Sequence, residues 1–115
     1  MNDLLNWIIS QGWGADAYGE FRARAARLRT VEPDNAAALR ILADLAGRFA
    51  DAYAGEPLSI DIAAKVRAQL LDILEAAIEN SSASAPERLA FLNEISKIDA
   101  LDGAESIALP RRHSV

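Results

Sequence analysis

The chain has 115 residues, an ordinary length for one domain and too short for two domains of usual size. Hydrophobic residues make up 51% of it, with 24 alanines among them, and the formal net charge is −5 at pH 7. This balance favours one compact core over intrinsic disorder. The absence of cysteine excludes a disulfide scaffold, thiolate metal sites and a cysteine nucleophile.

Helical periodicity fills the stretches between the glycines and prolines of the first half. A short helix is expected over 2–11, with aliphatic side chains opposite a narrow polar stripe. These side chains are Leu4, Leu5, Ile8 and Ile9. A second helix is expected from Asp16, its predicted cap, to about Val31, and Glu32 should end it because a residue before proline disfavours helical dihedrals. Its packing seam is Tyr18, Phe21, Ala25 and Leu28.

Three more helices are expected in the rest of the chain. The third begins near Pro33 and runs to about Ala54. Its inner face is Ala38, Leu42, Leu45, Phe49 and Tyr53. The fourth is capped by Ser59 or Asp61 and extends to about Asn80. Its apolar arc, which is broad enough to need more than one neighbour, contains Ile62, Val66, Leu70, Ile73, Leu74 and Ala77.

The fifth helix follows a short serine-rich linker. Ser84 and Glu87 form a capping-box pattern, in which the two side chains each satisfy a free backbone amide. The helix is expected to run to about Leu101, with Phe91, Leu92, Ile95 and Ile98 facing inward. Residues 103–115 show no period and are predicted to form a flexible tail.

No stretch alternates β-branched residues in the manner of a strand, so the predicted fold class is all-α. We expect residues 1–102 to form a single compact domain. Its architecture would be a bundle of about four main helices, with the short N-terminal helix docked across it.

The sequence lacks the residues that common active sites require. The one histidine, His113, stands third from the end, so neither a Ser-His-Asp triad nor a two-histidine zinc site is available. No glycine-rich loop with a following lysine could hold phosphate, and the acids from Asp99 to Glu105 lack the spacing of a calcium loop. We therefore predict no enzymatic activity, no cofactor and no metal.

Two charged features of the fourth helix have competing interpretations. Asp72, Glu75 and Glu79 share one side and could hold a divalent metal with a partner helix, although an exposed acidic face is the preferred interpretation. Arg67 falls inside the apolar arc, where it could extend its stem across Leu71 or pair with an acid from another helix. It is the candidate buried polar residue.

The second helix carries the basic cluster of the chain. Its members, the candidate basic surface, are Arg22, Arg24, Arg27 and Arg29. On a helical wheel they are dispersed instead of forming the single stripe that tracks phosphates. An intramolecular role, with this helix near the acidic fourth helix, is an alternative to nucleic-acid binding.

The N-terminal helix is the candidate partner-binding surface. Its proposed contact residues are Leu5, Trp7, Ile8, Ile9 and Trp13. The apolar arc is wide for a short helix, and tryptophan is common at the energetic centre of interfaces. The competing interpretation is that this helix caps the open end of the bundle as part of the core.

These observations lead to a functional expectation. We expect a small non-catalytic protein–protein interaction module, of the regulatory, adaptor, immunity-type or assembly kind, whose partner is another protein or a second copy of itself. The alternative is a nucleic-acid-associated regulatory factor that uses the arginine-rich second helix. The alanine and arginine content resembles that of a GC-rich bacterial genome, and the lack of a signal sequence or membrane-length apolar run predicts a cytoplasmic protein with no membrane contact.

Overall fold

The protein is an all-α bundle, as the sequence predicts. A computed structural model describes residues 1–11, 14–53 and 56–101. Their elements are α1 (Asn2–Ser10), α2 (Ala15–Val31), a 3-10 turn η1 (Pro33–Asn35), α3 (Ala36–Ala52), α4 (Ile60–Asn80) and α5 (Ala85–Ile95). No strand occurs in these three ranges. The predicted tail, 103–115, lies outside the described residues.

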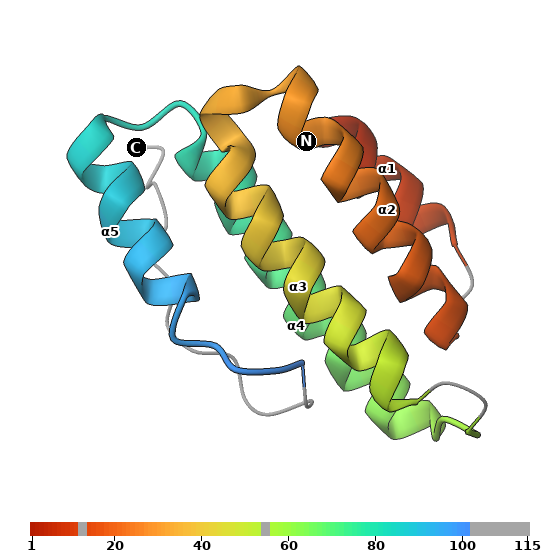
Figure 1. The fold of residues 1–115 in the computed structure, drawn as a ribbon. Coiled ribbons are helices and arrows are strands. Elements are labelled where there is room, and N and C mark those ends of the chain that lie inside the picture. The colour runs from red at the N-terminus through yellow and green to blue at the C-terminus, as the bar shows by residue number, and fades with distance from the viewer. Residues whose placement is uncertain (12–13, 54–55, 102–115) are drawn as a thin grey trace.

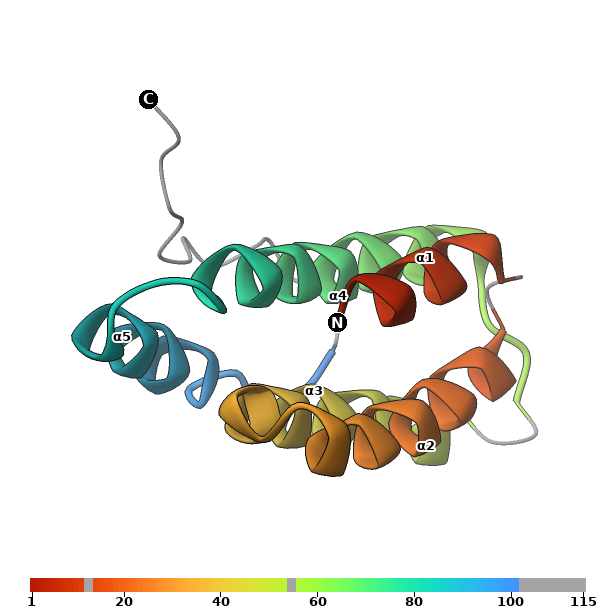
Figure 2. The same ribbon diagram turned by 90° about the horizontal axis from the view of Figure 1, so that it is seen from above.

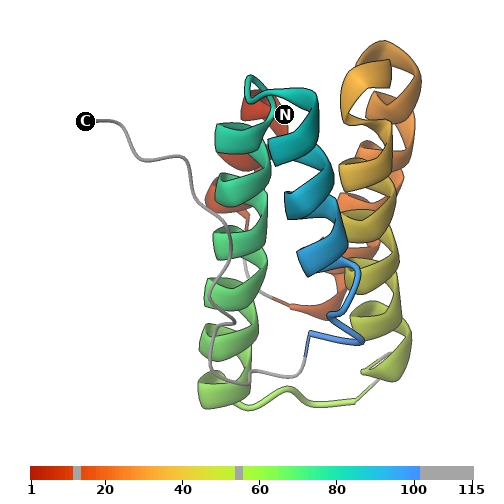
Figure 3. The ribbon, with the colours of Figure 1, turned by 90° about the vertical axis from the view of Figure 1, so that its left-hand side faces the viewer.

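The helices form two layers with α5 beside them. In Figure 2, α1 and α4 lie on one side of the molecule, and α2 and α3 lie on the other. The turn η1 reverses the chain, so α2 and α3 pack against each other along their lengths (Figure 1). Figure 3 shows α5 between α3 and α4, the two helices that it contacts. Helix α1 contacts both α2 and α4 and so joins the two layers.

The core follows the predicted helical faces closely. Three of the four residues in the α2 seam, Tyr18, Phe21 and Ala25, are fully buried, and Leu28 is half-buried. The Tyr18 ring meets the Phe49 ring edge-on, with the centroids 4.6 Å apart. The broad arc of α4 is covered by α1, α3 and α5 together, which satisfies the expectation of more than one neighbour. Its exception is Ile62, which is 37% exposed near the start of the helix.

Two of the three predicted helix caps are confirmed. The Ser59 hydroxyl accepts a hydrogen bond from the Ile62 amide at 3.2 Å, and that of Ser84 accepts one from the Glu87 amide at 3.4 Å. The reciprocal half of the capping box is not formed, because the Glu87 carboxylate accepts from the Ser84 hydroxyl at 3.0 Å and not from a backbone amide. The cap predicted at Asp16 is wrong. Helix α2 begins one residue earlier with Gly14 as its N-cap, which places Asp16 in the first turn.

The predicted ends of α2 and α4 are confirmed, but the end of α5 is wrong. Helix α5 stops at Ile95, six residues before the predicted Leu101. The following turn lets the chain bend back, so that Leu101 is buried in the core and 3% exposed. The Asp99 carbonyl also accepts a hydrogen bond from Arg48 of α3 at 2.8 Å. A helix extended to Leu101 would direct these groups differently and lose both contacts.

Candidate protein-interaction surface

Helix α1 divides its apolar residues between the core and the surface. Leu4 and Ile8, one turn apart, are buried at 3% and 0% exposure, while Leu5 and Trp7 are half-buried against the core. Ile9 points outward and is 47% exposed. The core interpretation therefore fits Leu4 and Ile8. The partner contacts proposed at Leu5, Trp7 and Ile9 stay predictions, whereas the full burial of Ile8 does not fit a partner contact. Trp13 lies outside the described residues.

A stack of charged and aromatic groups joins α1 to α2. The Arg24 guanidinium lies over the Trp7 ring, 4.3 Å from its centroid, and pairs with the Glu20 carboxylate at 3.2 Å. The same carboxylate oxygen is 3.7 Å from the guanidinium of Arg27. One carboxylate therefore serves two arginines on this face, and Arg27, with 67% of its side chain exposed, is the less engaged of the two.

The contact between α1 and α2 leaves a groove, which we call the α1–α2 groove. It has a volume of about 180 Å³. It is lined by Asp3, Leu4, Arg24, Arg27, Leu28 and Val31. Val31, the last residue of α2, is 73% exposed at its rim. The groove combines an aliphatic floor with two guanidinium groups, and it was not foreseen from the sequence. The available signal was Val31, an aliphatic residue of the second helix that falls outside the packing seam.

An ion pair fixes one end of this face. The Met1 ammonium donates a hydrogen bond to Glu32 Oε2 at 2.7 Å, and Asn35 Nδ2 donates to Glu32 Oε1 at 2.9 Å. The hydrogen bond from the ammonium group lowers the pKa of Glu32, with a further contribution from Asn35, against the opposing effect of burial. This pair holds the start of α1 against the junction between α2 and η1.

Of the two remaining arginines of α2, Arg22 faces α3 and does not extend a phosphate-binding stripe. The Arg22 side chain lies across Gly47, where a Cβ atom would come within 2.6 Å of Arg22 Cδ. Its guanidinium is 4.0 Å from Asp51 of α3. Arg29 is half-buried. The carboxylates that pair with the arginines of α2 therefore belong to α2 itself and to α3. The idea that α2 lies near the acidic fourth helix is wrong, because α1 and α3 are its helical neighbours among the described residues.

Arg67 is half-buried on α4 and acts on a core residue of the opposite layer. Burial raises the pKa of Tyr18, and the positive charge of Arg67 partly offsets this effect. The prediction that Arg67 is a buried polar residue is confirmed only in part, because its side chain is half-buried.

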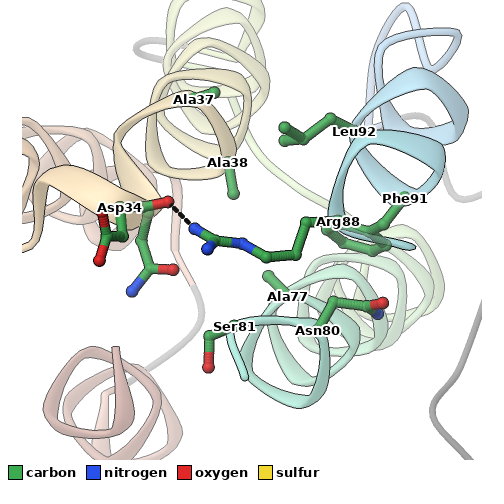
Figure 4. A pocket seen from close by; sticks show the side chains of 10 residues that line it. Asp34, Ala37, Ala38, Ala77, Asn80, Ser81, Arg88, Phe91 and Leu92 are labelled. Carbon is green, nitrogen blue, oxygen red and sulfur yellow. Dashed lines mark hydrogen bonds between the residues drawn. The ribbon is translucent and has the colours of Figure 1, made fainter. Parts of the chain in front are cut away.

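A small pocket at the junction of α3, α4 and α5 has a structural explanation. Its volume is about 30 Å³, which is room for one or two water molecules. Figure 4 shows the Arg88 side chain crossing it to donate a hydrogen bond to the Asp34 carbonyl. The buried Asn80 donates to the Ala76 carbonyl at 2.8 Å. The bond from Arg88 attaches α5 to the turn η1, and the bond from Asn80 closes the last turn of α4 on itself.

The acidic side chains do not assemble into a metal site in the described part of the chain. No group of three or more histidine, cysteine, aspartate or glutamate residues there is placed to hold an ion. Asp72, Glu75 and Glu79 are half-buried along α4. Within the same residues, no helix is long and apolar enough to cross a membrane.

Comparison with known proteins gave no relative: no protein family, no curated protein and no solved structure matches this chain. What the chain can bind therefore follows from the surfaces of the molecule itself. Among the described residues, the α1–α2 groove brings the strongly exposed Val31 together with the guanidinium groups of Arg24 and Arg27.

Proposed function

We propose that this chain is a small non-catalytic protein–protein interaction module that binds its partner through the face formed by α1 and α2. The observation that carries the proposal is the α1–α2 groove, where Val31 and Leu28 leave apolar surface in water beside Arg24 and Arg27. Interfaces commonly combine an apolar centre with arginine and tryptophan, and Trp7 stacks on Arg24 at the edge of this groove. A regulatory, adaptor, immunity-type or assembly role would each use such a surface.

The arginines of α2 favour this function over nucleic-acid binding. Arg24 is engaged by Trp7 and Glu20, and Arg22 lies over Gly47 towards Asp51. A phosphate-binding helix needs guanidinium groups that are aligned and free to exchange counterions. The dispersion of this set and the net charge of −5 both oppose that use.

The proposal can be tested by co-purification with a matched pair of surface variants. The tagged full chain would be recovered from its own cell as wild type, Val31→Gln and Leu89→Gln. Val31 and Leu89 are both exposed aliphatic residues, at 73% and 59%, on different helices. Glutamine is a good helix former without charge, so each change removes apolar contact and little else.

We expect a protein partner that is recovered with wild type and Leu89→Gln and is lost or strongly reduced with Val31→Gln. Thermal unfolding followed by circular dichroism would verify that both variants keep the fold. Recovery of the same partner with all three chains would contradict the α1–α2 face as the binding surface. Recovery of nucleic acid instead of protein would favour the alternative function.

A further inference from the structure

The lining of the α1–α2 groove has more cationic than anionic side chains, and a neighbouring carboxylate, Glu20, is shared by both of its arginines. Its lining contains two guanidinium groups, Arg24 and Arg27, and one carboxylate, Asp3, in a chain whose net charge is −5. Glu20 is divided between both arginines, and its distance to Arg27 is 3.7 Å. The groove is therefore suited to a segment that brings an aliphatic side chain together with a carboxylate.

The chain itself exposes such a segment at the start of α4. Ile60, the first residue of the helix, is 87% exposed, and Ile62 is 37% exposed. Asp61 stands between them and is also exposed. The Ser59 cap holds this turn in helical form, so the segment is presented in a fixed conformation. We call Ile60, Asp61 and Ile62 the α4 start.

We propose that the α4 start of one copy docks in the α1–α2 groove of a second copy, with Ile60 against Leu28 and Val31 and the Asp61 carboxylate at the Arg27 guanidinium. This inference rests on the proposed function, because it names the partner of the same groove. Its basis is the complementarity of the two surfaces: aliphatic groups meet aliphatic groups, and a carboxylate meets the less engaged of the two arginines.

The placement of the two surfaces makes the contact intermolecular. The end of α2, which carries Val31, and the start of α4 lie at opposite ends of the molecule in Figure 1. One copy therefore cannot fill its own groove. Two antiparallel copies related by a two-fold axis would make the same contact twice, which closes the assembly as a dimer.

A charge-swap experiment on the full chain tests this arrangement. Sedimentation velocity, from micromolar to millimolar protein, would compare wild type with Arg27→Glu, Asp61→Arg and the double variant. Each single reversal places like charges together and should weaken the dimer by about tenfold or more. The double variant restores opposite charges and should recover most of that loss. Arg40→Glu, which changes an arginine of similar exposure on α3, should leave the dimer unchanged.

The possible outcomes distinguish a failure of this docking from a failure of the proposed function. A wild-type chain that stays monomeric throughout, or a dimer that neither single variant weakens, would overturn the docking of the α4 start. So would a double variant that fails to recover. If the chain is monomeric but still loses a co-purified protein with Val31→Gln, the groove binds a different partner and the proposed function stands.

Discussion

The outer face of α3 and the face formed by α1 and α2 are both charged helical surfaces, yet they are built differently. On α3, Arg40 pairs with Asp44 at 3.2 Å, Arg48 donates to the Asp99 carbonyl, and the large aliphatic side chains are buried or half-buried. On the α1–α2 face, one carboxylate serves two arginines beside the exposed Val31. The α3 face also borders a cavity of about 240 Å³, but its charged groups are paired within the chain and it exposes no large aliphatic side chain. The α1–α2 face retains the exposed Val31 beside the less engaged Arg27, which a partner can use.

The largest expected effect on stability comes from truncating a side chain on the inner side of α1, and the same change on the outer side should have a small effect. Ile8→Ala should lower the free energy of unfolding by about 2–5 kcal/mol, because Ile8 is fully buried and its removal leaves a cavity. Ile9→Ala, at a site 47% exposed, should cost less than about 1 kcal/mol. Urea denaturation of the two variants measures both values. Equal losses would show that α1 is not divided between core and surface in this way.

A second prediction compares the stability lost on replacing one arginine of the α1–α2 face with that lost on replacing one arginine of the outer face of α3. Arg24→Ala removes the stacking on Trp7 together with the Glu20 pair, and should destabilise by about 0.5–1 kcal/mol. Arg40→Ala removes one exposed pair on α3 and should cost about 0.3–0.5 kcal/mol. A double-mutant cycle with Arg24→Ala and Trp7→Leu, measured by urea denaturation, would isolate the free energy of the stacking between the two side chains. A cycle with no coupling between Arg24 and Trp7 would remove this link between the helices.

The ion pair at the end of the α1–α2 face predicts a pH dependence. Because the pKa of Glu32 is lowered below its ordinary value of 4.5 in the folded state, its contribution is present above that value and is lost as the pH falls towards the folded pKa. The free-energy difference between wild type and Glu32→Gln should therefore be steady between roughly pH 5 and 7 and shrink at lower pH. Denaturation curves across this range check it, and a difference that grows on acidification would be inconsistent with the pair.

The smallest expected effect concerns nucleic acid. The dispersed arginines should give weak binding to duplex or single-stranded nucleic acid at physiological salt, with little change on replacing Arg22 and Arg29 together by alanine. Fluorescence anisotropy with labelled oligonucleotides measures this. Sub-micromolar binding with a steep salt dependence, abolished by that double replacement, would instead make α2 a nucleic-acid surface.

The parts of the fold that depend on nearby residues could be predicted from the sequence. The packing seam of α2 and the caps at Ser59 and Ser84 are set by side chains within a turn or two of each other. The end of α5 could not be predicted, because it depends on burial of Leu101 and on the bond between Arg48 and Asp99, residues 51 positions apart.

The candidate site was foreseen only in part for the same reason. The wheel of the first helix places Ile8 and Ile9 on one apolar arc, and only the packing of α1 on α2 and α4 decides that Ile8 is buried and Ile9 is not. The wheel of the second helix shows that its arginines are dispersed, but not that Glu20 is shared by two of them or that Val31 borders a groove. The sharing of Glu20 depends on side-chain conformations within α2, and the groove arises only where α1 and α2 meet.

Site-specific photo-crosslinking tests most directly whether the α1–α2 face is the binding surface. A photoreactive amino acid would replace Val31 on this face or Asp44 on the outer face of α3, in the tagged full chain inside its own cell. The account predicts a defined protein adduct, with a second copy or another protein, from position 31 and none from position 44. Equal adducts from both positions, or an adduct from position 44 alone, would contradict it.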